Sequence, residues 1–228
     1  MIPNFFTLFL LFLSKEVTLI RRSHESLIAV VFFSFVVILI FHFGFALEGP
    51  LASSFVLSFV WLATLFGGML RMNQTFEHEN EGKVLDGLRL AGSVATPFWL
   101  SKFVFNIFYL LFLEVVSFFL VVVLFNVDHP LGFLSRTWLP LFLGTLGFAC
   151  IGTTFSSMVA SHNRHHLILP VIVYPMIAPL IIGVLKSVVF GTNGSVLGLD
   201  GDWIKILVAF DLIFMVMSLV VFEKLWES

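Results

Sequence analysis

A charged segment, residues 75–90, stands out in an otherwise apolar chain. Its six charged residues fall within sixteen positions and are Glu77, Glu79, Glu81, Lys83, Asp86 and Arg89. Such a group of exposed charges is typical of a surface that binds another protein, and it lacks the converging acid, base or metal ligands of a catalytic site. No phosphate-binding loop of the form GxxxxGK[ST] occurs in the sequence. An ATP-driven function would therefore require an ATPase on another polypeptide.

Spacing within this segment predicts a helical face. Glu77, Glu81, Leu85 and Leu88 lie at i, i+4, i+8 and i+11, so they share one side of a helix. The early carboxylates also suit the positive end of the helix dipole. Gly82 costs about 1 kcal/mol inside a helix and favours a break between two short helices. Spacing alone leaves two interpretations open, a docking face and a solvated loop at the membrane surface.

Composition places the chain in a membrane. It has 228 residues, of which 59% are hydrophobic and 11% charged, and its mean hydropathy is +1.08. Ordinary globular proteins carry about 25% charged residues. The prediction is an all-α integral membrane protein with a single permease domain over residues 1–228. Its one cysteine, Cys150, excludes an internal disulfide, and no His/Cys cluster has metal-ligand spacing.

Six apolar segments are long enough to cross a bilayer core of about 30 Å. They cover approximately residues 26–47, 51–70, 98–127, 138–159, 167–189 and 203–222. The preceding segment, residues 1–22, has a polar stripe interrupted only by Leu11, which predicts a helix lying in the membrane interface. A short extra span is the alternative. Small residues in the fourth segment predict close helix packing.

The distribution of Lys and Arg predicts the orientation. Six spans put both termini on one side, and nine basic residues fall there: Lys15, Arg21, Arg22, Arg71, Lys83, Arg89, Lys102, Arg164 and Lys224. The other side has three: Arg136, Lys186 and Lys205. Because cytoplasmic loops are enriched in Lys and Arg, both termini and residues 75–90 are predicted to be cytoplasmic.

Three ionisable residues, Glu114, Lys186 and Asp211, fall inside predicted spans. Ionisable groups in spans are costly and are functional candidates by default. The structural alternative is that Lys186 pairs with Asp211 and that Glu114 is protonated in a helix contact. Histidines could ligate haem, but only His42 and His129 lie toward the outer side. No cofactor is therefore predicted to be bound by this chain itself.

The loop pattern resembles that of type-2 ABC exporter permeases, and most closely the CcmB family. The matching residues are Phe76, Glu77, Glu81, Gly82, Leu85, Asp86, Leu88, Pro97 and Lys102. Further likeness comes from Gly67-Gly68 and from the run Leu169-Pro170 with Pro175 and Pro179. Asp86 stands where Glu is usual in the family. Length and the six-span layout extend the resemblance over essentially the whole chain.

The resemblance implies a non-catalytic subunit in the bacterial inner membrane, acting in cytochrome c biogenesis. The expected partners are a cytosolic ATPase (CcmA), CcmC, CcmD, the periplasmic haem chaperone CcmE and a second copy of this chain, with no nucleic acid. Haem and ATP would be handled by those partners. The implied ATPase-coupling residues are Glu77, Glu81, Gly82, Leu85, Asp86 and Leu88. Two activities fit this role, haem export and release of the haem-loaded chaperone.

Two other functions remain open from the sequence. One is a permease for a lipid-linked or polysaccharide substrate, which would share the six spans and the coupling segment. The other is a scaffold that transports nothing and assembles a haem lyase. Span one and the proline-containing span five are the predicted candidates for the dimer interface and for the moving element.

Overall fold

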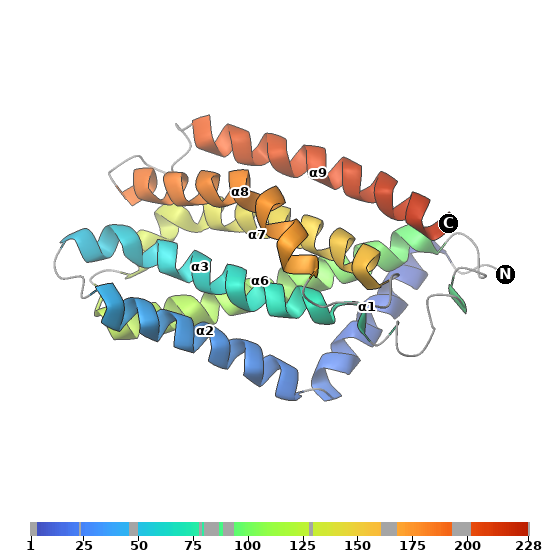
Figure 1. Cartoon of the computed structure of the whole chain (residues 1–228), viewed down its shortest axis with the longest axis horizontal. Coiled ribbons are helices and arrows are strands. Elements are labelled where there is room, and N and C mark those ends of the chain that lie inside the picture. Colours follow the sequence, from blue (N-terminus) through green and yellow to red (C-terminus); the bar gives the residue numbers. More distant parts are fainter. Residues whose placement is uncertain are drawn as a thin grey trace.

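The computed structural model describes a bundle of long helices. The residues that it describes are 4–22, 24–45, 50–77, 79, 87–88, 94–127, 130–160, 168–192 and 202–227. The helices are α1 (Phe5–Arg22), α2 (His24–Phe45), α3 (Pro50–Gln74), α6 (Ala95–Phe125), α7 (Pro130–Ala160), α8 (Ile168–Thr192) and α9 (Asp202–Glu227). Except for α1, they run lengthwise in alternating directions (Figure 1). We call the end of the bundle with α1 and the last turn of α9 the α1 end, and the opposite end the far end.

Five of the described helices are long and apolar enough to cross a membrane. These spans are Leu27–Gly44, Ala95–Phe125, Thr137–Ala160, Leu169–Val188 and Asp202–Trp226. They confirm an integral membrane protein built from helices. The predicted second span lies in α3, which is not among the five, so the count of six spans stays a prediction. Nine basic residues were predicted to lie on one side of the membrane. Those of them in described helices lie toward the α1 end of the bundle.

α1 lies across the end of the bundle, at an angle to the other helices (Figure 1). Its surface has three faces. Glu16 is buried and, with Phe12 and Leu13, faces the bundle. A second, apolar face is exposed, with Phe6, Leu10 and Val17 at 67%, 46% and 39% exposure. The predicted polar stripe forms the third face and is also exposed: Asn4, Thr7, Ser14, Thr18 and Arg21.

α6 ends slightly before the predicted span at residues 98–127 does. Its last residue is Phe125, and it is capped by Asn126, which has the left-handed φ of 47° and donates its N–H to the Val122 carbonyl. Asparagine tolerates this conformation better than most residues, so it closes the helix. α7 then begins at Pro130. Proline suits the first position of a helix because no hydrogen bond is required of its nitrogen there.

Small residues bring α7 close to its neighbours, as predicted. A β-carbon on Gly147 would overlap the Leu180 side chain of α8 and the Asp211 carboxylate of α9. Likewise, a β-carbon on Gly68 of α3 would overlap the side chains of Leu110 and Phe148. These contacts place α7 at the centre of the bundle, where it packs against α3, α6, α8 and α9.

Gly147→Ala is therefore expected to destabilise the bundle by about 1–3 kcal/mol, the usual effect of overpacking. Gly132→Ala in the same helix is the matched control, because no atom lies within 4 Å of the added carbon. Alanine is favoured over glycine in helices, so that variant should be neutral or slightly stabilised. Thermal unfolding in detergent measures both. Equal stability of the two variants would contradict the close packing.

Candidate coupling site

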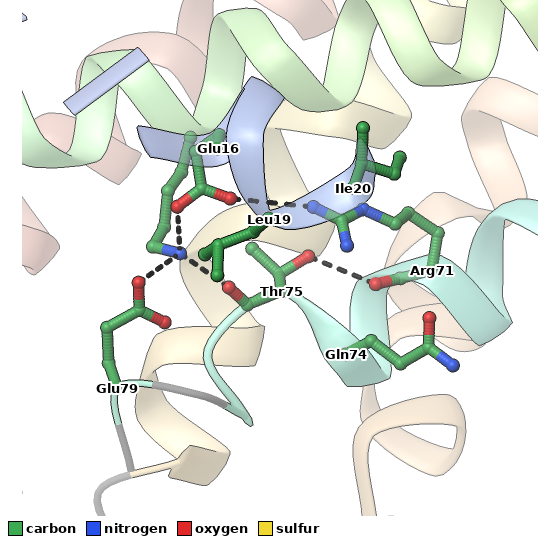
Figure 2. Close-up of a pocket in the computed structure, with 8 residues that line it drawn as sticks. Glu16, Leu19, Ile20, Arg71, Gln74, Thr75 and Glu79 are labelled. Carbon is green, nitrogen blue, oxygen red and sulfur yellow. Dashed lines mark hydrogen bonds and ion pairs between the residues drawn. The ribbon is translucent and has the colours of Figure 1, made fainter. Parts of the chain in front are cut away.

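Charged side chains from three helices meet at the α1 end. They come from α1, from the last turn of α3 with the residues just after it, and from the first turns of α6 (Figure 2). We call Lys15, Glu16, Arg71, Glu79 and Lys102 the ion cluster. Glu16, Glu79 and Lys102 are 4%, 1% and 1% exposed. Because ionised groups are rarely buried unless they are paired, this arrangement constrains how the three elements pack.

Lys102 is the centre of the ion cluster. Its Nζ lies 2.8 Å from Glu16 Oε1, 2.9 Å from Glu79 Oε1 and 2.6 Å from the Thr75 carbonyl oxygen. An ammonium group has three donors, so these three acceptors satisfy it completely. The ring of Phe76 also lies beneath it, with the centroid 4.7 Å from Nζ. One buried cation thus joins α1, α6 and the start of residues 75–90.

The two carboxylates have different surroundings. Glu16 bonds Lys102 through Oε1 and lies with Oε2 at 3.7 Å from Arg71 Nη2. Glu79 receives both Lys15 and Lys102 on Oε1. Its Oε2 is buried and has no hydrogen-bond partner in the part of the chain that the structure describes. Both carboxylate oxygens of Glu16 therefore face cations, whereas only one oxygen of Glu79 does.

Arg71 completes the ion cluster from α3. Its guanidinium carbon lies 5.1 Å and 5.3 Å from the ring centroids of Phe105 and Tyr109, within cation–π distance. Arg71, Thr75, Glu79 and Lys102 are among the residues that line a cavity of about 20 Å³ beside the cluster (Figure 2). A cavity of that size has room for about one water molecule. Three cations face two carboxylates here, so the cluster carries one excess positive charge.

Hydrogen bonds extend from the ion cluster into α7. Asn106 Nδ2 donates to Thr75 Oγ1 at 3.3 Å and to Thr153 Oγ1 at 2.9 Å. Ser156 of α7 donates to the Met72 carbonyl at 2.7 Å. The end of α3 is therefore fixed to both α6 and α7 where residues 75–90 begin.

The charges around Glu79 lower its pKa. Burial alone would raise the pKa of this carboxyl, but the charges and hydrogen bonds of Lys102 and Lys15 outweigh burial and bring the pKa below its ordinary value of 4.5. Opposite charges within hydrogen-bond distance favour the ionised form of a carboxyl group. Glu79 is therefore ionised at neutral pH and bound as a carboxylate.

This shift predicts a pH dependence. Because the pKa is lower in the folded than in the unfolded chain, Glu79 stabilises the fold above pH 4.5 and this contribution is lost as the pH falls through the folded-state pKa. Thermal unfolding of wild type and of Glu79→Gln, measured from pH 7 to pH 3, tests this. The wild type should lose more stability on acidification than the variant. Parallel pH profiles would contradict the assignment.

The predicted docking residues are described only in part. Glu77 is half-buried, and Leu88 is half-buried and packs against the main core. Glu81, Gly82, Leu85 and Asp86 lie outside the described residues. The docking face therefore stays a prediction. Within residues 75–90 the structure describes Thr75–Glu77, Glu79 and residues 87–88.

Glu114 lies in the bundle core at 8% exposure and contacts α7. Thr145 donates its hydroxyl to Glu114 Oε1 at 2.6 Å. This contact joins α6 to α7 and accounts for a polar residue in the middle of a span. The helix contact named in the structural alternative is therefore present, and protonation of Glu114 stays a prediction.

The expected pairing of Lys186 with Asp211 is wrong. Lys186 is exposed on α8, and both carboxylate oxygens of Asp211 are buried without a hydrogen-bond partner among the residues described. Asp211 lies against Gly147 and Leu180. Lys186 is six residues beyond Leu180, about 9 Å along the helix at 1.5 Å per residue, and faces outward. Asp211, in α9, therefore lies near the face of α8 that carries Leu180, and Lys186 lies on another face of α8.

Replacing Glu114 separates a structural role from a charge-dependent one. Glu114→Gln should keep the stability and the activity, because the amide oxygen can still accept from Thr145. Glu114→Ala should lose about 0.5–1.5 kcal/mol, because the hydrogen bond between α6 and α7 is lost while Thr145 keeps its 3.0 Å bond to the Leu141 carbonyl. Thermal unfolding measures the stability, and formation of cytochrome c, the role that the resemblance implies, measures the activity. Loss of that activity in a stable Glu114→Gln protein would show that ionisation is needed.

Sequence reasoning missed most of the ion cluster. Lys102 belongs to the family pattern and to the basic count, Lys15 and Arg71 entered the prediction only as basic residues, and Glu16 entered no prediction. A signal did exist, because Lys102 is a cation near the start of an apolar span and such a residue needs a buried partner. Its partners lie 86 and 23 residues away in the sequence, at Glu16 and Glu79.

Comparison with known proteins places the chain in a family. The family model described as CcmB protein matches residues 7–224. No curated protein and no solved structure matches the chain. The match covers nearly the whole sequence and agrees with the membrane-spanning helices. The chain belongs to the CcmB family, whose members are the membrane permease component of the ABC system for haem transport and cytochrome c maturation.

Proposed function

We propose that this chain couples ATP hydrolysis by the cytosolic ATPase CcmA to release of haem-loaded CcmE from CcmC. Residues 75–90 are the coupling segment that the ATPase binds, with Glu77, Glu81, Gly82, Leu85, Asp86 and Leu88 as its contact residues. The ATPase activity belongs to that partner. Release is preferred over haem conduction because the sequence has no evident pair of histidines to hold haem in a path.

The ion cluster is the observation that carries this proposal. A segment that transmits force needs a firm attachment where it enters the membrane domain. Lys102 holds Glu79 and the Thr75 carbonyl, and so fixes the start of the coupling segment to α6. The hydrogen bonds of Asn106 extend the attachment to α7. Movement of the coupling segment would therefore displace α6 and α7, the helices to which it is attached.

The topology we propose has six spans, with α3 as the second, and both termini in the cytoplasm. α1 is proposed to lie in the cytoplasmic interface. Its three faces support this, because a helix at that position contacts protein, lipid and water at once. The functional unit is proposed to be a homodimer that assembles with CcmA, CcmC and CcmD.

Charge reversal in the coupling segment tests the proposal. Glu81→Lys/Asp86→Lys should abolish co-purification with CcmA while membrane insertion is retained. Continued binding of the ATPase by this variant would contradict the docking role. A permease for polysaccharide would show its defect at the cell surface, with cytochrome c intact, when the chain is deleted.

A further inference from the structure

The two carboxylates of the ion cluster belong to different elements. Glu16 is in α1, within a regular helix, whereas Glu79 is in the coupling segment just beyond α3. Both bind the same Lys102 nitrogen, at 2.8 Å and 2.9 Å. Any movement away from α6 of the part of the coupling segment beyond Phe76 must separate Glu79 from Lys102. What happens to the buried cation then depends on Glu16.

We propose that Glu79 is a releasable tether of the coupling segment, and that Glu16 keeps Lys102 and Arg71 paired when Glu79 leaves. This proposal rests on the proposed function, because the ATPase supplies the movement. Both residues are positioning residues. They act by holding the segment in this structure and by allowing it to depart.

Glu79 can separate from Lys102 without leaving a buried charge unpaired. Lys102 keeps Glu16 at 2.8 Å and the Thr75 carbonyl at 2.6 Å, and Arg71 keeps Glu16. Lys15, the other cation on Glu79, has a side chain that is 38% exposed and can turn to water. The carboxylate itself would become hydrated on the cytoplasmic surface. Each charge therefore retains a counter-ion or gains solvent.

Glu79 contacts cations through one carboxylate oxygen, whereas Glu16 faces cations with both. Both cations of Glu79 share Oε1, while Oε2 is buried and finds no partner among the described residues. A buried acceptor that lacks a hydrogen bond is destabilising. This lowers the barrier to departure of Glu79 relative to a carboxylate with both oxygens satisfied. The opposite arrangement, in which Glu16 leaves, would remove the counter-ion of Arg71 and leave Lys102 with Glu79 alone.

The tether assigns different motions to two neighbouring elements. α1 stays with α6 during the ATPase cycle, because Glu16 and Lys102 remain paired. The part of the coupling segment beyond Phe76 moves relative to both, while Thr75 stays bound to Lys102. If instead α1, the coupling segment and α6 moved as one rigid body, all the ion pairs of the ion cluster would stay intact throughout the ATPase cycle.

Neutralising each carboxylate in the intact complex separates these cases. Glu79→Gln should leave the rate of ATP hydrolysis at or above that of the wild type. The amount of cytochrome c formed per ATP hydrolysed should fall about fivefold or more, because couplings between two sites typically begin at about that size. Glu16→Gln should instead slow hydrolysis, because release of Glu79 would then leave Lys102 without a counter-ion. Asp202→Asn, at an exposed position at the far end, is the control and should match wild type. The tether would be overturned if both Gln variants changed the rate of ATP hydrolysis equally, or if neither variant changed it.

A distance measurement keeps the test independent of those substitutions. Spin labels are placed at Thr18 of α1, Thr96 of α6 and Gly87 of the coupling segment, all exposed. Pulsed EPR is recorded in nanodiscs with and without vanadate-trapped nucleotide, with labelled chain diluted by unlabelled chain. The Thr18–Gly87 distance should change and the Thr18–Thr96 distance should not. A fixed Thr18–Gly87 distance would overturn the tether, as would a changed Thr18–Thr96 distance.

Failure of the proposed function gives a different result. In that case the wild-type chain would not co-purify with the ATPase at all, and no nucleotide-dependent state could be trapped. Co-purification with unchanged distances contradicts the tether alone.

Discussion

Replacing Lys102 with methionine is expected to have the largest effect on stability of any single substitution in this chain. The change leaves Glu16 and Glu79, at 4% and 1% exposure, without their shared cation. Breaking a buried ion pair on one side costs about 3–5 kcal/mol. Lys102→Met leaves Glu79 with only Lys15, whose side chain is 38% exposed, and Glu16 with only Arg71 at 3.7 Å. The coupling segment should also lose its attachment to α6. Thermal unfolding in detergent and limited proteolysis within residues 75–90 measure the two consequences.

Removing Lys102 together with one of its carboxylates is the informative control. Glu79→Gln/Lys102→Met removes one complete buried pair, leaves Glu16 to Arg71 and should recover most of the stability lost in Lys102→Met. Replacing a complete buried ion pair by neutral groups is often harmless to stability. Lys186→Met, at an exposed position on α8, should change neither property. A Lys102→Met protein as stable as wild type would show that the ion cluster does not hold the coupling segment.

The second large effect is expected from Glu81→Lys/Asp86→Lys. Two reversals change the charge of the coupling segment by four units and put like charge where the ATPase is proposed to meet carboxylates. Like charges brought together at an interface cost several kcal/mol. Loss of binding should be complete in a pull-down from detergent-solubilised membranes. Because both residues lie outside the apolar spans, the amount of inserted chain should be unchanged.

A single reversal at a different place controls for general charge effects. Glu223 is exposed in the last turns of α9, at the same end of the bundle as the coupling segment. Glu223→Lys should leave ATPase binding intact. If it also abolishes binding, the loss in the double variant reflects total charge and not the coupling segment.

Much of the helical layout could be predicted from hydropathy. The apolar segments that were expected to cross the membrane correspond to α2, α3, α6, α7, α8 and α9, with ends shifted by a few residues or, at the start of α7, by eight. Local chemistry set those ends, as at Asn126 and Pro130. The polar stripe of α1 was also visible, since a helix repeats every 3.6 residues whatever lies around it.

The ion cluster could not be predicted in the same way. Lys15 and Glu79 are 64 residues apart, and Lys102 and Glu16 are 86 residues apart. Nothing local specifies which side of α1 meets α6. The pairing of Lys186 with Asp211 failed for a related reason, because opposite charges at similar depth do not meet unless the helices turn them toward each other. Long-range packing decides both cases.

The most direct test of the account is ATP-dependent release of haem-loaded CcmE. Inner-membrane vesicles containing CcmA, CcmC, CcmD and this chain are charged with haem-loaded CcmE, and the fraction that dissociates on addition of ATP is measured. Coupling through residues 75–90 predicts release with the wild-type chain and none with Glu81→Lys/Asp86→Lys. Equal ATP-dependent release from both membranes would contradict it.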